Sequence, residues 1–115
     1  ILSNTVTHTN ILALHHPPVR CFSEVMDNIA LKNPDELEEL LLFYNNVQLI
    51  VCGHVHRSIF TSFAQSQIAF CPSVVFQYPI FMARGKSIPT GEQPGFHVHK
   101  FKKKLGWSTH LRLIT

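Results

Sequence analysis

The stretch "VQLIVCGHVHR", residues 47–57, decides the fold. A mostly apolar run ends at Gly53 and is followed at once by two histidines, His54 and His56. A short apolar run bounded by a turn residue is typical of a strand that is buried on both faces of a parallel sheet. We therefore expect a strand over residues 47–52, a tight turn at Gly53, and both histidines just beyond the strand's carboxyl end.

A second stretch upstream, "ILALHHPPV" at residues 11–19, has the same layout. Its apolar run, residues 11–14, predicts another strand that is buried on both faces. His15 and His16 follow this run, and two consecutive prolines then end regular structure.

The residues between these stretches predict a helix. Asn33 suits an N-cap, Pro34 the first helical position, and Glu36 the acidic position of a capping box. Apolar residues at helical spacing predict one buried face, made of Leu37, Leu40, Leu41 and Tyr44. Residues 20–33 are expected to be irregular, with a short helical turn. Strand, helical crossover and strand form a βαβ unit, so the two strands should run parallel.

The later part of the chain predicts antiparallel structure. A polar turn at residues 65–67 predicts a hairpin, residues 74–81 predict an extended piece, and residues 95–115 predict a second hairpin. The length of 115 residues suits one mixed α/β domain. The net charge of +3 comes largely from lysines at the second turn, which we interpret as a solvated hairpin tip and not a nucleic-acid site: Lys100, Lys102, Lys103 and Lys104.

The cysteines and the hydropathy indicate the cellular compartment of the protein and whether it crosses a membrane. Three cysteines, Cys21, Cys52 and Cys71, are an odd number without a C-x-x-C motif, which favours a reduced, cytoplasmic protein. No apolar run approaches the roughly 18 residues that a membrane span needs, so no membrane partner is expected.

The histidines carry the functional prediction. Ligands of an open parallel sheet bind beyond the carboxyl ends of its strands, so His15, His54 and His56 should converge on one rim. Three neutral imidazoles on a rigid rim suit a divalent transition metal such as Zn, Mn or Fe. We expect only one of the adjacent histidines, His15, to face the common centre, which leaves His16 to shape the pocket or to contact the substrate. Two further candidate substrate-binding residues are Arg20 and Arg57.

Four other histidines are expected to have no metal role. His97 and His99 form a second H-x-H pair, but they lie inside an alternating strand and should face solvent. His8 and His110 are expected to be ordinary surface residues.

The motifs "HHPP" (residues 15–18) and "CGHVHR" (residues 52–57) resemble those of calcineurin-like metallophosphoesterases. The segment "VMDNIALKNPDELEELL" (residues 25–41) is similar to the class III cyclic nucleotide phosphodiesterase branch, as are the closing segments "PSVVFQYPIF" (residues 72–81) and "EQPGFHVHKF" (residues 92–101). The resemblance extends from about Asn10 to Ile114.

The resemblance implies a four-layer α/β/β/α sandwich with two divalent metals, Fe, Mn or Zn, at its rim. His15 and His54 would bind one metal and His56 the other. A hydroxide that bridges the metals would attack the phosphorus of a small phosphodiester, 3',5'-cyclic AMP or a related compound.

The upstream motifs of that family, D-x-H, G-D-x-x-D and G-N-H-[DE], are not found in residues 1–115. We therefore expect residues 1–115 to be the C-terminal half of a single metallophosphoesterase domain, with at most one metal site partly formed and no activity alone.

Two other interpretations use the same histidines. One is a phosphodiesterase for another substrate, such as a glycerophosphodiester. The other is an inactive fragment that acts as a binding or dimerising module, either as a homodimer or by pairing with the missing N-terminal half.

Overall fold

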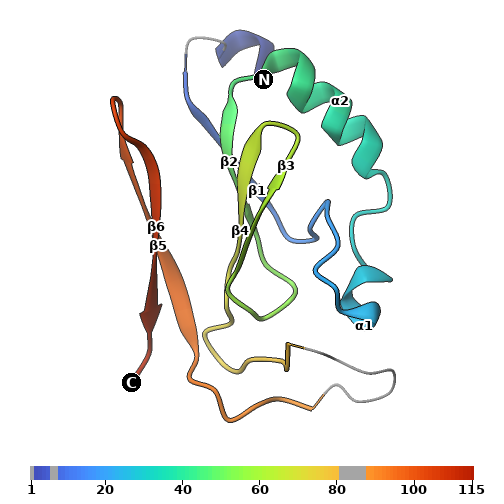
Figure 1. The fold of residues 1–115 in the computed structure, drawn as a ribbon, viewed down its shortest axis with the longest axis vertical. Helices are drawn as coiled ribbons and strands as arrows, with labels where there is room; N and C mark the ends of the chain where they lie inside the picture. The colour runs from blue at the N-terminus through green and yellow to red at the C-terminus, as the bar shows by residue number, and fades with distance from the viewer. Residues whose placement is uncertain (1, 6–7, 81–87) are drawn as a thin grey trace.

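The computed structural model describes residues 2–5, 8–80 and 88–115, and it contains three layers (Figure 1). Two helices, α1 and α2, cover one face of a four-stranded sheet, and a two-stranded ribbon lies on the other side. The predicted mixed α/β fold, with a βαβ unit followed by antiparallel strands, is confirmed.

The βαβ unit forms as predicted. Strand β1 spans Asn10–Leu14 and pairs in parallel with β2, Val47–Cys52. The crossover contains a short helix α1, Glu24–Asp27, and the longer helix α2, Pro34–Tyr44. A 3-10 helix, Leu2–Thr5, precedes β1.

Helix α2 begins and ends where its sequence indicates, but the bond made by Asn33 and the exposure of Leu40 differ from the prediction. The Asn33 side chain makes no cap bond to the backbone and instead donates from Nδ2 to Glu36 Oε2 at 3.1 Å. Asn45 ends the helix in the left-handed conformation, with φ of 49°, which asparagine tolerates well. Leu41 is buried, but Leu40 is 45% exposed, so its predicted place in the buried face is wrong. The contact with the sheet is centred on Leu41, and Leu40 lies beyond its edge.

The first hairpin extends the same sheet. Strands β3, Ile59–Phe63, and β4, Ser66–Phe70, pair antiparallel, and β4 also pairs in parallel with β2. The strand order is β1-β2-β4-β3. The carboxyl ends of β1, β2 and β4 therefore lie at one rim of the sheet.

Strand β2 is buried on both faces, as predicted, but strand β1 is not. Ile50 and Cys52 of β2 face the helices, while Leu49 is buried on the opposite face. In β1, Leu12 packs against the core, whereas Ile11 is 47% exposed. The prediction for β1 is wrong because β1 is an edge strand.

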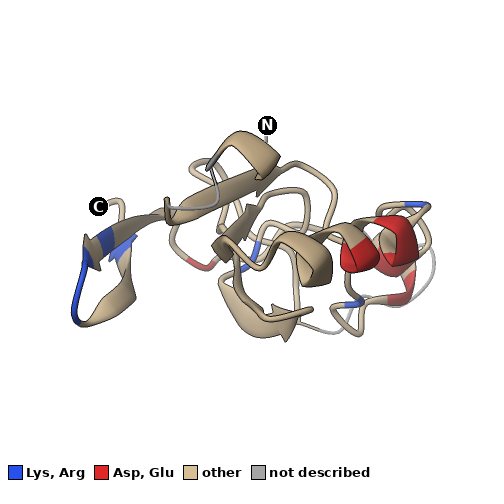
Figure 2. Ribbon diagram, turned by 90° about the horizontal axis from the view of Figure 1, so that it is seen from above, with Lys and Arg blue, Asp and Glu red and all other residues tan. Residues whose placement is uncertain are grey.

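The ribbon consists of β5, Gly95–Lys102, and β6, Gly106–Leu113, which pair antiparallel as predicted. Its lysine-rich tip is exposed and lies at the opposite end of the molecule from the acidic residues of the helices (Figure 2). None of the helices in the described ranges combines the length and apolar character that crossing a membrane requires.

The extended piece predicted over residues 74–81 is not a strand between residues 74 and 80, and residue 81 lies outside the described part of the chain. Buried Gln77 closes a turn instead. Its Nε2 donates to the Ser73 carbonyl at 2.7 Å, and its Oε1 accepts from the Ser73 N–H at 3.3 Å. This side chain takes backbone hydrogen bonds that a sheet partner would otherwise supply.

The central position of β2 leads to a stability prediction. Ile50 is fully buried in the core, so Ile50→Ala should lower the free energy of unfolding by about 3 kcal/mol, through lost burial and the cavity left behind. Leu42→Ala, at a position that is 45% exposed, should cost less than about 1 kcal/mol. Urea unfolding of both variants measures the difference, and equal losses would contradict the core assigned here.

Candidate metal centre

The loop after β2 has an unusual backbone. His54 and His56 both adopt positive φ, 69° and 54°, a region that non-glycine residues enter rarely. The Val55 N–H donates to the Gly53 carbonyl at 2.8 Å, which closes a three-residue turn around His54. Such a conformation costs about 1–3 kcal/mol per residue and is concentrated at functional sites.

Gly53 has a different role from the one expected. The positive φ falls on the histidines and not on Gly53. A Cβ added at Gly53 would lie 3.3 Å from His15 Nδ1, closer than most real Cβ contacts. The absent side chain therefore makes room for the His15 imidazole beside the turn.

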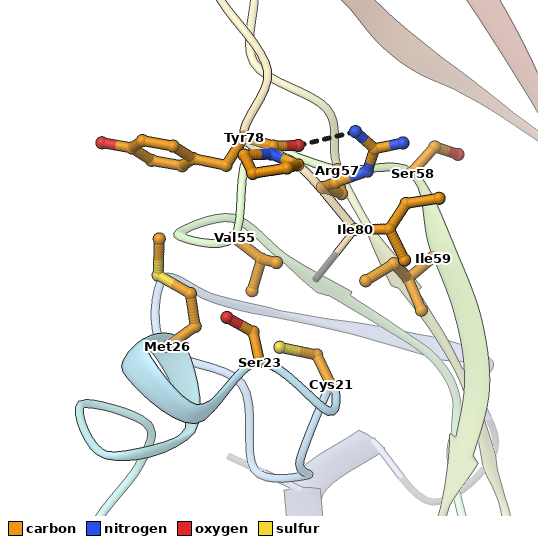
Figure 3. A pocket seen from close by; sticks show the side chains of 10 residues that line it. Cys21, Ser23, Met26, Val55, Arg57, Ser58, Ile59, Tyr78 and Ile80 are labelled. Carbon is orange, nitrogen blue, oxygen red and sulfur yellow. Dashed lines mark hydrogen bonds between the residues drawn. The ribbon is translucent and has the colours of Figure 1, made fainter. Parts of the chain in front are cut away.

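Val55 and Arg57, which alternate with the two histidines, face a cavity of about 200 Å³ between α1 and the segment around Tyr78 (Figure 3). The Arg57 guanidinium donates to the Tyr78 carbonyl at 2.6 Å and forms an ion pair with Glu92 at 2.8 Å. The structure thus places this predicted substrate-binding residue at the cavity wall, where it ties the loop to two later segments.

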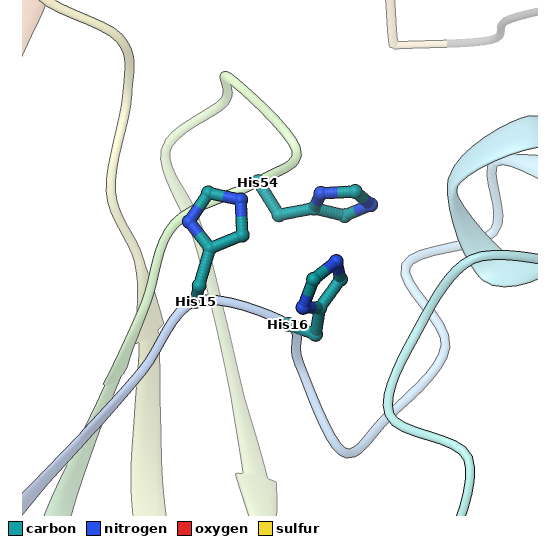
Figure 4. Close-up of side chains that lie close together, drawn as sticks. All are labelled: His15, His16 and His54. Atoms are coloured by element: carbon teal, nitrogen blue, oxygen red, sulfur yellow. The ribbon is translucent and has the colours of Figure 1, made fainter.

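Three imidazoles come together at the rim: His15 and His16 follow β1, and His54 follows β2 (Figure 4). One ring nitrogen of each lies within 4.8 Å of the others. The ring centroids are 4.9 Å apart for His15–His16, 5.3 Å for His15–His54 and 4.6 Å for His16–His54. The expectation that only one of the adjacent histidines faces the common centre is wrong, because both lie in a bend beyond the strand, where alternation no longer applies.

The electrostatics at His54 favour its neutral imidazole. Burial, followed by the charges of His16, His15 and His56, lowers the pKa of His54 from its ordinary value. His54 Nε2 is buried and has no hydrogen-bond partner. A neutral, unpartnered ring nitrogen is the form that binds a metal ion.

The cluster fits a divalent transition metal in donor type and in spacing. Nitrogens held about 2.1 Å from one ion lie about 3.4 Å apart. One ring nitrogen of each histidine already lies within 4.8 Å of the other two. The two histidines that follow β1 are exposed, which leaves the centre open on one side.

The expected convergence of His56 with His15 and His54 is not observed, because His56 lies outside this group. Its ring stacks on Tyr78, with centroids 5.1 Å apart, and lies 4.7 Å from the Phe76 ring. Its Nδ1 is buried without a hydrogen-bond partner. Neither aromatic residue was predicted to lie at the site, because their segment was expected only to be an extended piece.

The remaining candidates lie around the cluster. His16 borders a surface depression formed with residues 28–33, a part of the crossover. Arg20 is exposed and borders a separate depression together with Phe22 and Glu24. His8 and His110 are exposed, as expected.

His97 and His99 do not face solvent as expected. Both are half-buried, and His97 stacks on Phe60 with centroids 5.2 Å apart. Burial lowers the pKa of both imidazoles. The alternating pattern correctly predicted that both side chains lie on the same face of the strand. That face packs toward the four-stranded sheet and not toward solvent.

Comparison with known proteins agrees with this geometry. The family model described as calcineurin-like phosphoesterase matches residues 1–58, which include both histidine stretches. A 3',5'-cyclic-nucleotide phosphodiesterase of Nostoc is 27% identical over 105 residues, which cover 90% of this chain and 38% of the relative. The glycerophosphodiester phosphodiesterase GpdQ of Enterobacter lignolyticus is 33% identical over 68% of this chain and 28% of the relative.

A third relative, the 3',5'-cyclic adenosine monophosphate phosphodiesterase CpdA of Escherichia coli, is 30% identical over 62% of this chain and 26% of its own length. The chain thus spans between a quarter and two fifths of the length of these relatives. Because the family model matches half of the chain, and the histidines that gather at the rim lie in the matched half, this chain belongs to the calcineurin-like phosphoesterase family.

Proposed function

We propose that this chain supplies the histidine ligands of a metal-dependent phosphodiesterase that acts on 3',5'-cyclic AMP or a related small phosphodiester. The observation that carries the proposal is the gathering of His15, His16 and His54 at the carboxyl rim of a parallel sheet. The names of similar proteins from Nostoc and Escherichia coli support the cyclic nucleotide as substrate.

In this proposal His15 and His54 hold one divalent ion, Fe, Mn or Zn, with His16 close enough to join them or to contact the substrate. When bound, such an ion supplies Lewis-acid chemistry, because it lowers the pKa of water and neutralises phosphate charge. The chain's own contribution is to orient its ligands: the strained turn fixes His54, and Gly53 leaves space for His15.

His56 is proposed as the ligand of a second metal. Its stacking on Tyr78 holds the ring at a fixed angle, and its unpartnered Nδ1 is available as a donor. The groups of potential ligands found in the described residues contain no carboxylate. We therefore propose that the acidic ligands of a dinuclear centre lie outside residues 1–115.

The substrate's organic group would lie beside the cluster. The depression formed by His16 and residues 28–33 adjoins the cluster and is open to solvent, as a small phosphodiester requires. Arg57 is proposed to act indirectly, because its pairing with Glu92 and the Tyr78 carbonyl holds the wall against which His56 stacks. The three free cysteines are consistent with a cytoplasmic location.

A glycerophosphodiester is the second candidate substrate, favoured by the similarity to GpdQ. Both substrate classes use the same metal ligands, so the histidine rim does not separate them. Competition between cyclic AMP and glycerophosphoethanolamine for the manganese-loaded protein would separate the two substrate classes.

The metal site is tested by removing one ligand. His54→Ala should weaken Mn²⁺ binding by at least about tenfold, because one of the three imidazoles of the cluster is lost. Isothermal titration calorimetry measures the affinity, and His110→Ala, at an exposed histidine of the ribbon, is the matched control. Equal Mn²⁺ affinity in the unaltered chain and both variants would refute the proposed site.

The role of Gly53 is tested by adding one methyl group. Gly53→Ala places a Cβ 3.3 Å from His15 Nδ1, so the imidazole must move and Mn²⁺ affinity should fall several-fold. Gly91→Ala, where no atom lies within 4 Å of the added Cβ, should bind as the unaltered chain does. If both substitutions leave the affinity unchanged, His15 does not hold the ion.

A further inference from the structure

A second group of metal-ligating side chains lies on the ribbon side of the sheet. Cys71 follows directly after β4, at the same rim as the histidine cluster, and its N–H donates to the Cys52 carbonyl at 2.6 Å. His97 and His99 are alternate residues of β5 and share one face. The Cys71 Sγ and one ring nitrogen of each histidine lie within 4.8 Å of one another.

Hydroxyl groups orient both imidazoles. Ser58 Oγ lies 2.8 Å from His97 Nε2, and Thr109 Oγ1 lies 2.9 Å from His99 Nδ1. The other nitrogen of His97, Nδ1, is buried and has no hydrogen-bond partner. Histidines that bind metals almost always anchor the second ring nitrogen on an oxygen in this way, which fixes the tautomer.

We infer that Cys71, His97 and His99 bind a zinc ion, separate from the metal centre at His15, His16 and His54. One thiolate and two imidazoles are a donor set that zinc prefers, and a water would complete its tetrahedral coordination. Binding forms one sulfur–zinc bond and releases the thiol proton to solvent. The soft thiolate favours Zn²⁺ over hard ions such as Mg²⁺, so this site differs in selectivity from the all-imidazole cluster.

The position of the site suggests what the ion does. In the described part of the chain, the ribbon and the four-stranded sheet share no strand pairing. Among the described residues that join them are the Ser58–His97 hydrogen bond and the stack of Phe60 on His97. An ion held by Cys71 of one sheet and by two histidines of the other would clip the two layers together, and its binding energy would add to the stability of the fold.

Cobalt titration provides the test, because only a thiolate ligand gives a sulfur-to-cobalt charge-transfer band in the near ultraviolet. The purified chain should show this band at one equivalent, and Cys71→Ser should abolish it. Cys21→Ser, at a half-buried cysteine elsewhere, and His54→Ala, in the first cluster, should retain it. Retention of the band in Cys71→Ser, or its absence from the folded unaltered chain, would overturn the inference.

A second variant keeps the test independent of any folding defect in Cys71→Ser. His99→Ala should weaken cobalt binding at least about tenfold, whereas His110→Ala on the neighbouring strand should not. Zinc should likewise raise the melting temperature of the unaltered chain by several degrees more than that of His99→Ala, in which the first cluster alone still binds the ion. Identical cobalt affinities in His99→Ala and His110→Ala would exclude His99 as a ligand and overturn the site.

Discussion

The parallel pairing of β1 with β2 is the constraint on which the rest of the structure depends. In parallel register Leu14 lies opposite Cys52, so the residues that follow the two strands emerge side by side at one rim. Residues that are 38 positions apart in the chain, His16 and His54, then bring their ring centroids within 4.6 Å. Antiparallel pairing would send them to opposite ends of the sheet. The helical crossover makes the parallel arrangement possible, and its packing through Leu41 holds β2 in the centre of the core.

Local strain then determines how the rim is used. Two histidines with positive φ within three residues are costly, and the surrounding contacts must hold them in place. Arg57 supplies part of that support by joining the loop to the Tyr78 carbonyl and to Glu92. The same loop ends at Ser58, whose hydroxyl orients His97 toward Cys71. One loop thus supports both clusters: an all-imidazole cluster that is open to solvent and suits catalysis, and a half-buried cysteine–histidine cluster that suits a structural ion.

Much of this could be predicted from the sequence because local patterns govern it. The apolar run of β2, the cap and proline of α2 and the turn of the ribbon gave those elements within a few residues of their observed bounds. The errors lie where long-range contacts decide. Periodicity cannot show that Leu40 lies beyond the edge of the helix contact, that β1 is an edge strand, or that Gln77 closes a turn with Ser73. Alternation placed His97 and His99 on one face of a strand, but only the packing of the ribbon against Phe60 determines which face is covered. The candidate site divides in the same way: the convergence of His15 and His54 followed from topology, whereas the inclusion of His16 depended on a bend beyond the strand.

The central claim is that His15 and His54, which follow two parallel strands, hold one metal ion with His16 beside it. Nitrogen-15 NMR of the imidazole side chains during a titration with paramagnetic Mn²⁺ tests it most directly, because broadening reports the distance of each ring from the ion. Of the eight histidines in the chain, His15, His16 and His54 should broaden first at substoichiometric Mn²⁺, while His8 and His110 stay sharp. Uniform broadening of all the histidines, or broadening that spares His54, would contradict the account.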